Sequence, residues 1–493
     1  MNTGDRENEE DRAIIVDNEV IENPVVQNDF QGVISNPKPR RYFIEPAVFL
    51  LFAGSSLFET IVPNAVELQY CRTMLNLTQE QCFSPTIDLK VKDEYEKFAS
   101  TFNIYRSIIE VAIPSFISFF IGPWSDTYGR KPLILSSLLG YSATYGLWTF
   151  ASSIPAFHPL YFLFFSLPLA FSGGSTTFIL GSFCYVCDVT TLENRGYRLG
   201  RLQGALFMGA LGGMQSYLLL EPFGYTMIYG VSSVFVYLSL FYIYFFLDES
   251  IIPSQVELNS PKRNPFHLHH ILELYECCYK RQTPKMRITL FLLTLILACS
   301  LVNVFGETNV LYLFLQRVLN WNMTQYTYLS SFIIIANAIG AAGGTWLLCR
   351  VLQLDDLLIL SIAAFFRVLS ALVMIFGFRV WHIYFSKLLS CTLGISGSII
   401  RSFLSRNVGK DELGKVFSLL ASTESTTPMF ANLLYSTIFN LTLETMPGAI
   451  FYVSGFLILF MLGCLAILVK MYIPDPTKRS LAVTQDTPSI NAN

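Results

Sequence analysis

Hydrophobic residues gather in long runs that alternate with short polar stretches along most of this chain. A helix needs about 20 apolar residues to cross the hydrocarbon core of a bilayer, and about twelve runs reach that length. The pattern therefore predicts an all-α integral membrane protein of about twelve transmembrane helices, arranged as two six-helix bundles. The predicted spans are 43–66, 102–124, 133–153, 160–186, 202–220, 227–247, 288–315, 326–348, 357–378, 383–404, 416–439 and 449–471.

Polar segments divide the chain into five predicted parts. An acidic N-terminal tail occupies 1–42, and its Asn, Glu, Asp and Pro content cannot bury enough apolar surface to order it. This tail lacks an apolar stretch of signal-peptide length, so we expect the first spanning helix to act as the targeting signal. The other parts are the first bundle, a central cytosolic loop, the second bundle and a cytosolic C-terminal tail, at 43–247, 248–287, 288–472 and 473–493.

The composition points to lipid rather than water as the surrounding medium. Of the 493 residues, 52% are hydrophobic and 14% are charged, and the mean hydropathy is +0.47, whereas soluble domains carry about 25% charged residues. The net charge of −3 gives no sign of a nucleic-acid partner. The sequence shows neither a catalytic constellation nor a Cys or His cluster of zinc-like spacing, so we expect no enzyme and no bound metal or cofactor.

The loop charges predict the orientation of the chain in the membrane. Lys and Arg gather in the N-terminal tail and in the even-numbered loops, for example at Lys131 and Lys262. Because cytosolic loops carry an excess of these residues, both termini are predicted to be cytosolic. The N-glycosylation sequons at Asn76, Asn322 and Asn440 all fall in odd-numbered loops, on the lumenal or extracellular side of this topology.

Two of the ten cysteines differ from the others in their surroundings. Most cysteines lie inside apolar runs, where a thiol acts as a small apolar core group. Cys71 and Cys82 instead fall in the long first exofacial loop. Disulfides persist in that compartment, so we predict a local disulfide between them.

A glycine-rich polar motif follows the second predicted helix, with Gly122, Asp126, Gly129, Arg130 and Lys131 in the pattern G-x-x-x-D-x-x-G-R-K/R. The glycines permit close helix approach and a tight turn. The acid can accept from the arginine or lie near the N-terminus of a neighbouring helix, where negative charge is favourable. The motif resembles the signature of the major facilitator superfamily, which implies a conformational latch at the cytosolic ends of two bundles. A plain turn with basic residues on the cytosolic side is the alternative.

Four segments spread over the chain resemble solute carrier family 46, the proton-coupled folate transporter family. They are Ile44-Glu45-Pro46-Ala47, the stretch Ser125-Asp126-Thr127-Tyr128-Gly129-Arg130-Lys131-Pro132, Cys187-Asp188-Val189-Thr190 and Ile400-Arg401-Ser402-Phe403-Leu404-Ser405. The resemblance implies a symporter of anionic organic solutes, such as folates or peptide-derived and nucleotide-like anions.

The chain departs from the folate-transporting branch of that family at two positions. That branch carries a carboxylate in the fifth helix and a histidine in the seventh, both tied to proton handling, and Gln203 and Val304 stand there in this sequence. Folate is therefore a less expected substrate, and any proton coupling must use other residues. Arg401 matches the family's basic residue at the end of the tenth helix, and Glu424 resembles an acid of another branch.

Charged residues within the predicted spans are candidates for function, because an ionisable group in the membrane is costly unless it is paired or hydrated. The set comprises Glu59, Arg106, Glu110, Glu307, Arg367, Lys387, Arg401 and Glu424. From it we predict Lys387, Arg401 and Arg106 as substrate-binding cations and Glu307, Glu424 and Glu110 as proton-coupling acids. Structural readings stay open for an Arg106–Glu110 pair on one helix face and for Arg401 as an interfacial residue whose head reaches the water.

The leading functional hypothesis is a secondary transporter that moves a small organic anion by alternating access, coupled to protons. Rival readings are a transporter-like receptor or scaffold without flux, and an uncoupled facilitator. The chain is expected in the plasma membrane or in endosomes and lysosomes, since Glu10-Asp11-Arg12-Ala13-Ile14-Ile15 resembles an acidic dileucine-type sorting signal.

The predicted orientation can be tested by the placement of glycans and of the central loop. We expect N-glycans on the exofacial loops, foremost at Asn76, while Lys262 stays on the cytosolic side. A glycosidase mobility shift that is lost in Asn76→Gln, together with protease digestion of sealed vesicles, measures both. Protection of Lys262 inside lumen-enclosing vesicles would contradict the orientation.

Overall fold

Apolar runs of spanning length become helices throughout the computed structural model. It describes residues 43–82, 89–154, 157–251, 272, 276, 283–321, 323–377, 379–409, 412–442, 445–446 and 448–472. The predicted tails, nearly all of the central loop and Asn322 lie outside these residues. Helices and turns, without a strand, make up the described ranges.

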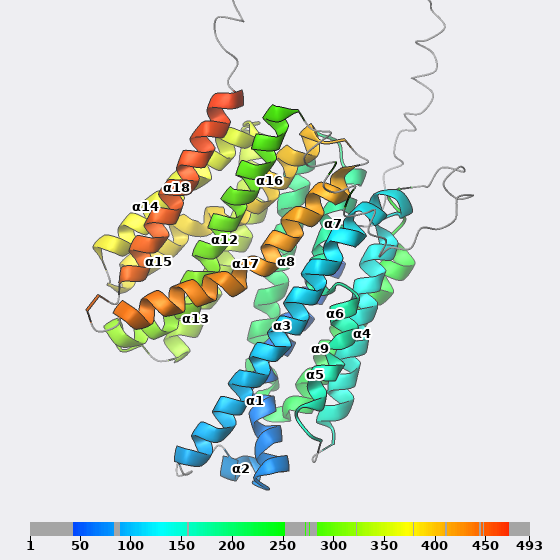
Figure 1. Ribbon diagram of the computed structural model, residues 1–493, viewed down its shortest axis with the longest axis vertical. Coiled ribbons are helices and arrows are strands. Elements are labelled where there is room, and N and C mark those ends of the chain that lie inside the picture. The colour runs from blue at the N-terminus through cyan, green and yellow to red at the C-terminus, as the bar shows by residue number, and fades with distance from the viewer. Residues whose placement is uncertain are drawn as a thin grey trace, which may run out of the picture. The chain divides into compact units, whose positions relative to one another are not determined.

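The first half of the chain folds into helices that Figure 1 shows from blue to green. They are α1 (Glu45–Met74), α2 (Gln79–Cys82), α3 (Leu89–Tyr128), α4 (Lys131–Ser152), α5 (Tyr161–Phe165), α6 (Leu167–Phe171), α7 (Gly174–Val189), α8 (Arg195–Leu220) and α9 (Tyr225–Phe246), with a 3₁₀ turn at Glu221–Phe223. Within this half α1 packs against α8 and α9, and α4 packs against α7 and α9.

The second half is also helical, and Figure 1 shows it from green to red. Its helices are α12 (Pro284–Leu319), α13 (Met323–Ile339), α14 (Asp356–Phe376), α15 (Val380–Leu389), α16 (Leu393–Asn407), α17 (Leu413–Thr442) and α18 (Ala449–Tyr472), with π-helical turns at Gly340–Gly344 and Trp346–Val351 and a 3₁₀ turn at Ser390–Thr392. Here α12 packs against α17 and α18, while α14 contacts α15, α16 and α18.

Length and composition support some, but not all, of the predicted membrane crossings. Within the described ranges, nine helices or helix series are long and apolar enough to cross a membrane. Helices α4, α8 and α17 coincide with predicted spans but fall outside this group. Glycine and hydroxyl-bearing residues lower the mean hydropathy of α4, and charged or polar side chains lower that of α8 and α17. The helical membrane fold is thus confirmed, while the count of twelve stays a prediction.

The fourth predicted span differs from the prediction of one continuous helix over 160–186. The chain forms α5, α6 and α7 there, and all three belong to one candidate membrane span, Tyr161–Val189. A new helix begins at Leu167 with Pro168 in its first turn, and Gly173 takes a φ of +84°. Such a φ is easily adopted by glycine and interrupts a right-handed helix. The break leaves the Ser166 hydroxyl free to bond a neighbouring helix.

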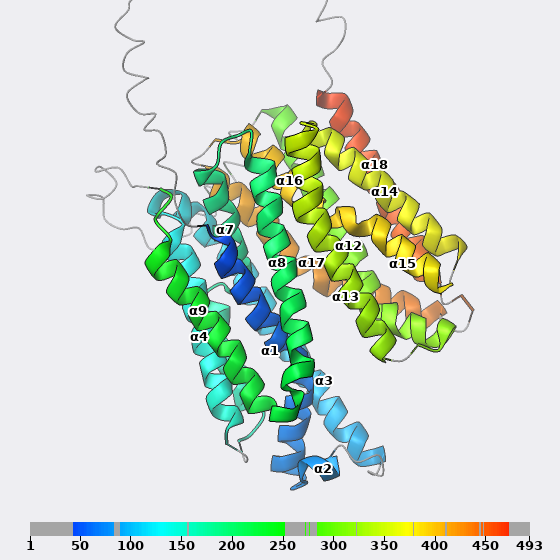
Figure 2. The same ribbon diagram turned by 180° about the vertical axis from the view of Figure 1, so that it is seen from behind.

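Close helix packing depends on glycine where α8 crosses α1, which lie side by side in Figure 2. A Cβ at Gly213 would lie only 2.3 Å from the carbonyl oxygen of Ala53. Glycines in membrane helices allow backbones to approach closely. Gly213 of the fifth predicted span therefore serves packing within the first half, whereas a Cβ at Gly204 would lie 2.9 Å from the side chain of Ala342 in the second half.

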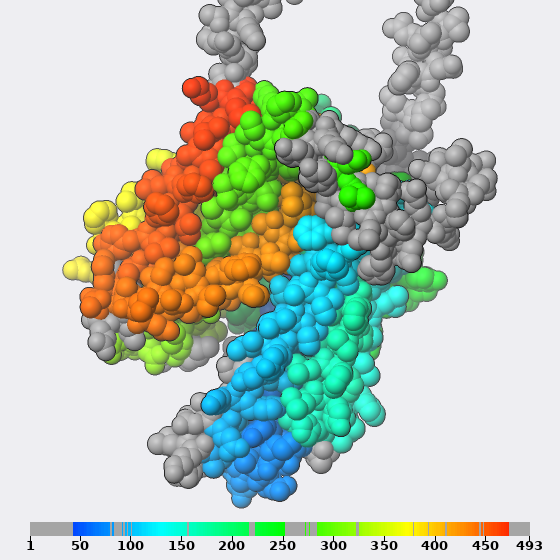
Figure 3. Space-filling model, viewed as in Figure 1, coloured from blue at the N-terminus to red at the C-terminus, as the bar shows by residue number. Residues whose placement is uncertain are grey.

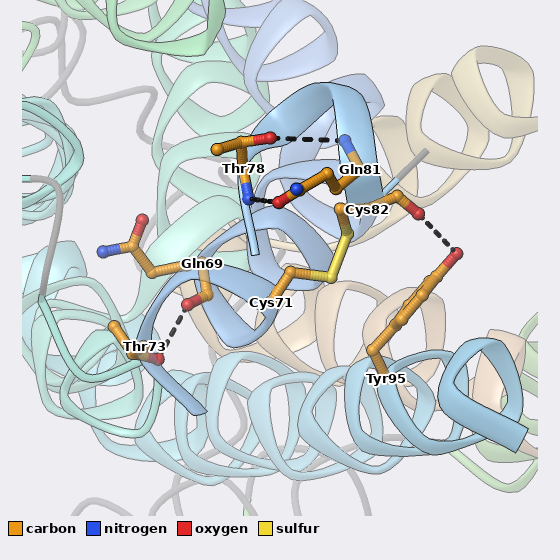
Figure 4. Close-up of a disulfide and its surroundings, with 7 residues drawn as sticks. All are labelled: Gln69, Cys71, Thr73, Thr78, Gln81, Cys82 and Tyr95. Carbon is orange, nitrogen blue, oxygen red and sulfur yellow. Dashed lines mark hydrogen bonds between the residues drawn. A yellow bond between two sulfur atoms is a disulfide. The ribbon is translucent and has the colours of Figure 1, made fainter. Parts of the chain in front are cut away.

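A disulfide between Cys71 in α1 and Cys82 in α2 cross-links the segment between α1 and α3, as Figure 4 shows. Their Cα atoms are 6.1 Å apart, and both side chains are fully buried beside Tyr95. The Tyr95 hydroxyl donates to the Cys82 carbonyl at 3.3 Å. Asn76 lies in the same loop, is exposed, and takes a φ of +54°.

We predict that Cys71 and Cys82 are oxidised to this disulfide in the mature protein. Closing a loop of 11 residues should stabilise the segment by about 3 kcal/mol against local unfolding in a chain-entropy treatment. Mass mapping of proteolytic fragments without reduction should recover the Cys71 and Cys82 peptides as one linked species. Two free thiols at these positions would refute the pairing, and the buried thiol of Cys464 provides an unpaired reference.

Candidate functional site

A cavity of about 1170 Å³ lies between the helices of the two halves. Its wall comes from α1, α3, α7 and α8 on one side and from α12, α16 and α17 on the other. In Figure 3 the surface is hollowed beside the place where α17 (orange) meets α3 (light blue). Ligand pockets of about 300–1,000 Å³ hold drug-sized molecules, so this cavity has room for a bulky organic solute.

The wall is largely apolar, with polar groups scattered over it. Three carboxylates, Glu67, Glu110 and Glu424, contribute to it, and the described lining contains no lysine or arginine. Gln203 and Val304 both line the cavity as well. The two positions where this sequence departs from the folate-transporting branch therefore face the same space.

An ion pair between Arg401 on α16 and Glu424 on α17 stands at the cavity wall. Glu424 lines the cavity, whereas Arg401 is 3% exposed and lies behind it. The guanidinium carbon of Arg401 is 4.0 Å from the ring centroid of Phe183, which belongs to α7 in the other half. The pair thus joins a buried cation to an acid that solvent or solute can reach.

A second ion pair lies deeper in the second half, between Lys387 on α15 and Glu307 on α12. The Lys387 amine donates to a Glu307 carboxylate oxygen at 2.6 Å. Both side chains are largely buried, and neither contributes to the described wall of the cavity. The predicted substrate-binding lysine and the predicted coupling acid are therefore partners of each other in this conformation.

The first half holds a cluster of one cation and two acids. Arg106 bonds Glu110 at 2.9 Å on its own helix and also pairs with Glu59 on α1. The Ser166 hydroxyl donates to Glu110 at 2.7 Å. Arg106 is buried, whereas Glu110 lines the cavity. With one cation and two acids, the cluster carries a net charge of minus one when all three groups are ionised.

The motif residue Asp126 ties the two halves together at one end of the bundle. Its carboxylate pairs with Arg130 at 2.6 Å and accepts from the backbone N–H groups of Gly414 at 2.7 Å and Lys415 at 3.2 Å. Those groups belong to the first turn of α17. A carboxylate is favourable there because unpaired N–H groups and the helix dipole meet at a helix N-terminus. A Cβ at Gly122 would lie 2.6 Å from the Gly414 carbonyl oxygen, so these helices touch through their backbones.

Two acids that contact the motif residues were absent from the sequence prediction. Asp188 pairs with Arg130 at 3.1 Å, and Glu249 accepts from the backbone N–H groups of Arg130 at 2.7 Å and Lys131 at 3.0 Å. Asp188 stands in a segment that resembles the solute carrier family, which was a usable signal. Glu249 carries no motif, and its role depends on the return of the chain after α9. Gly129 takes a φ of +105° at this turn.

The remaining predicted residues lie away from the cavity. Asn76 and Asn440 are exposed, as an acceptor of a glycan must be, and Asn322 lies outside the described residues. In the part of the chain that the structure describes, no group of three or more His, Cys, Asp or Glu side chains could hold a metal ion.

Several characterised proteins are similar to this chain over most of its length. A probable peptidoglycan muropeptide transporter SLC46 of Drosophila melanogaster is 26% identical over 454 residues, covering 88% of this chain and 87% of that protein. The lysosomal proton-coupled steroid conjugate and bile acid symporter of Rattus norvegicus is 26% identical over 458 residues, covering 85% and 92%. The proton-coupled folate transporter of Bos taurus is 24% identical over 428 residues, covering 84% and 88%.

Solved structures share the fold. The human organic anion transporter MFSD10 matches with a TM-score of 0.68 at 16% identity, covering 86% of this chain and 97% of that one. The Escherichia coli fucose:proton symporter matches with a TM-score of 0.59 at 14% identity, covering 85% and 97%.

A family model, the Major Facilitator Superfamily, matches residues 71–432. The relatives and structural neighbours named here are all transporters rather than enzymes. The chain is thus a multi-pass membrane protein that belongs to the major facilitator superfamily of transporters and is similar to members of solute carrier family 46.

Proposed function

We propose that this protein is a secondary active transporter that moves a small anionic organic solute together with protons by alternating access. The observation that supports this function best is the Arg401–Glu424 pair, in which a buried cation is balanced by an acid on the cavity wall. Two of the similar proteins bear the words proton-coupled in their names. The predicted organelles, plasma membrane or endosome and lysosome, remain part of the proposal.

The pair provides a physical route for coupling. A proton on Glu424 neutralises the acid and leaves Arg401 as a buried cation without a counter-charge, which is costly. A carboxylate or phosphate of the solute can take that place through charge-assisted hydrogen bonds. Proton binding and anion binding then favour each other, and linkage requires this effect to be reciprocal.

Glu110 is the second acid that can exchange protons with the cavity. It shares Arg106 with Glu59, so a single proton on either carboxylate brings the cluster to neutrality. Glu307 has a weaker position for direct exchange, because it is paired with Lys387 behind the wall. We therefore rank Glu424 and Glu110 ahead of Glu307 among the proposed coupling acids, and Arg401 ahead of Lys387 and Arg106 as a substrate cation.

The motif around Asp126 holds the closed end of the cavity in this conformation. Residues Pro63, Glu67 and Asn103 line the cavity toward the other end of α1 and α3. With the predicted topology, the latch is cytosolic and the cavity faces outward. Alternating access then requires the Asp126 contacts with α17 to break when the solute moves inward.

Uptake into vesicles tests the proposed coupling. A pH difference of one unit provides about 1.4 kcal/mol per proton, enough for about tenfold accumulation in one-to-one symport. Purified protein in proteoliposomes should accumulate a labelled folate, conjugated bile acid or muropeptide when the outside is acidified. We expect Glu424→Gln to exchange the same solute across the membrane but to lose accumulation above equilibrium, because the shape is kept and the titrating group is lost.

Matched variants separate coupling from general damage. Glu110→Gln and Glu307→Gln test the other proposed acids, and Glu193→Gln changes an exposed loop acid and should behave as the parent. Accumulation by all three spanning-acid variants at the level of the parent would reject the coupling role. Binding without any flux would favour a receptor, and flux without response to pH would favour a facilitator.

The latch gives a separate prediction about turnover. Asp126→Asn should keep folding and surface expression but slow transport several-fold to about tenfold, since one of the two end states loses about 1 kcal/mol or more of charge-assisted bonding. Arg130→Ala should resemble it. Initial rates normalised to surface protein are the measurement, with Asp355→Asn, an exposed acid before α14, as the matched control. Unchanged turnover in Asp126→Asn at normal expression would exclude the latch role.

A further inference from the structure

One buried cation of the second half has no acid of its own. Arg367, on α14, is 3% exposed, and its guanidinium donates to the Ser300 hydroxyl oxygen at 2.7 Å and to the Ser300 carbonyl oxygen at 3.4 Å. Among the residues described, no carboxylate lies within ion-pair distance of it. Glu307 is close enough to act on it electrostatically, but that carboxylate is bonded to Lys387.

The charge of this cluster is the opposite of the cluster in the first half. Arg367, Lys387 and Glu307 sum to one positive charge when ionised, whereas Arg106, Glu59 and Glu110 sum to one negative charge. A buried cation is costly until a counter-charge or a set of hydrogen bonds compensates it. The positive charge of Arg367 therefore has no counter-charge of its own among the described side chains of the second half.

Ser300 connects this cation to the cavity. It stands on α12 and lines the cavity wall, while Arg367 lies behind it. Because its oxygen accepts from Arg367, its hydroxyl hydrogen must point elsewhere. The acceptor it meets is the sulfur of Met461 at 3.2 Å, and a thioether is a weak acceptor. The hydroxyl is thus a donor whose present acceptor is weak, and the oxygen of an anionic group would be a stronger one.

The neighbouring wall fits the body of an organic anion. Leu297, Leu301 and Val304 line the cavity around Ser300 on the same helix. The carboxylates of the lining include Glu110 on α3 and Glu424 on α17, and they repel an anion from their own parts of the wall. While these carboxylates are ionised, the wall at Ser300 is therefore a favourable place for an anionic group with an apolar body.

We propose that Ser300 and Arg367 form a subsite for one anionic group of the transported solute, a carboxylate, sulfonate or phosphate. The Ser300 hydroxyl donates to an oxygen of that group, and Arg367 supplies the compensating charge from behind as a positioning residue. This inference rests on the proposed transport of an anion. It adds a second anion position to the one proposed at Arg401, which depends on a proton on Glu424. Unlike Lys387, Arg401 and Arg106, Arg367 has no carboxylate at ion-pair distance among the described residues.

Thermal unfolding of the purified full-length protein in lipid nanodiscs tests the charge imbalance without any solute. Arg367→Met removes an uncompensated cation, so the unfolding temperature should stay equal or rise. Lys387→Met leaves Glu307 unpaired and should lower it. A fall in Arg367→Met as large as that in Lys387→Met would overturn the proposal, since Arg367 would then be a structural partner.

Binding of paired probes tests recognition directly. A folate, a conjugated bile acid and a muropeptide are each compared with the neutral ester or amide of the same molecule. In the parent protein we expect at least one acid to bind about tenfold tighter than its neutral form, as one charge-assisted contact provides. In Ser300→Ala and Arg367→Gln this preference should disappear, whereas Thr294→Ala, which loses only a hydroxyl bonded to the Leu290 carbonyl, should keep it.

The outcomes distinguish the subsite from the transport proposal. Equal preference for the acid in the parent and in Ser300→Ala overturns the subsite, even if the solute is transported. A parent protein that binds none of the three acids more tightly than their neutral forms also overturns it. Uptake that ignores an imposed pH gradient, with the acid preference still lost in Ser300→Ala, overturns the coupling and supports the subsite.

Discussion

Electrostatic compensation inside an apolar interior is the constraint on which the rest of this structure depends. A charge placed among membrane-spanning helices must meet an opposite charge, a polar backbone group or water. Four interactions provide this compensation: the ion pairs of Glu110, Glu307 and Glu424, and the backbone N–H groups that bond Asp126. The Arg106–Glu110 pair lies within α3, but Arg106 also pairs with Glu59 on α1, and the other three interactions join different helices or halves. The same interactions therefore restrict how the helices can move.

The pairing also explains why cations and acids divide as they do around the cavity. Arg106, Lys387 and Arg401 lie behind the wall and are paired with carboxylates, and Arg367 lies there with hydrogen bonds to Ser300. Acids such as Glu110 and Glu424 stand at the surface of the cavity. Under the proposed transport of an anion, the solute would meet positive charge through an acid that first takes a proton or through a hydroxyl such as that of Ser300. Binding of the anion would then depend on proton uptake or on an exchange of hydrogen-bond partners.

The sequence predicted the helix positions because each crossing needs about 20 apolar residues. A run of that length can be recognised even when it contains a few polar residues. The break at Pro168 and Gly173 was missed, since apolarity alone does not report a left-handed residue. Arg106 and Glu110 were found as a pair because both lie on one helix. The partners of Arg401 and Lys387 stand on other helices, and Glu249 reaches Arg130 only through tertiary folding. Contacts between distant segments leave little trace in one sequence.

The partners that Asp126 finds on α17 are main-chain N–H groups rather than side chains. Every residue except proline offers the same donor, so the closing contact depends on the backbone path of α17 and hardly on the identity of the side chain at Lys415. The side chains of this contact thus come from one half of the molecule, while the facing helix needs only a small residue at Gly414. The corresponding stretch of the second half, Gly340 to Arg350, contains no acid, and a contact made to main-chain N–H groups requires none there.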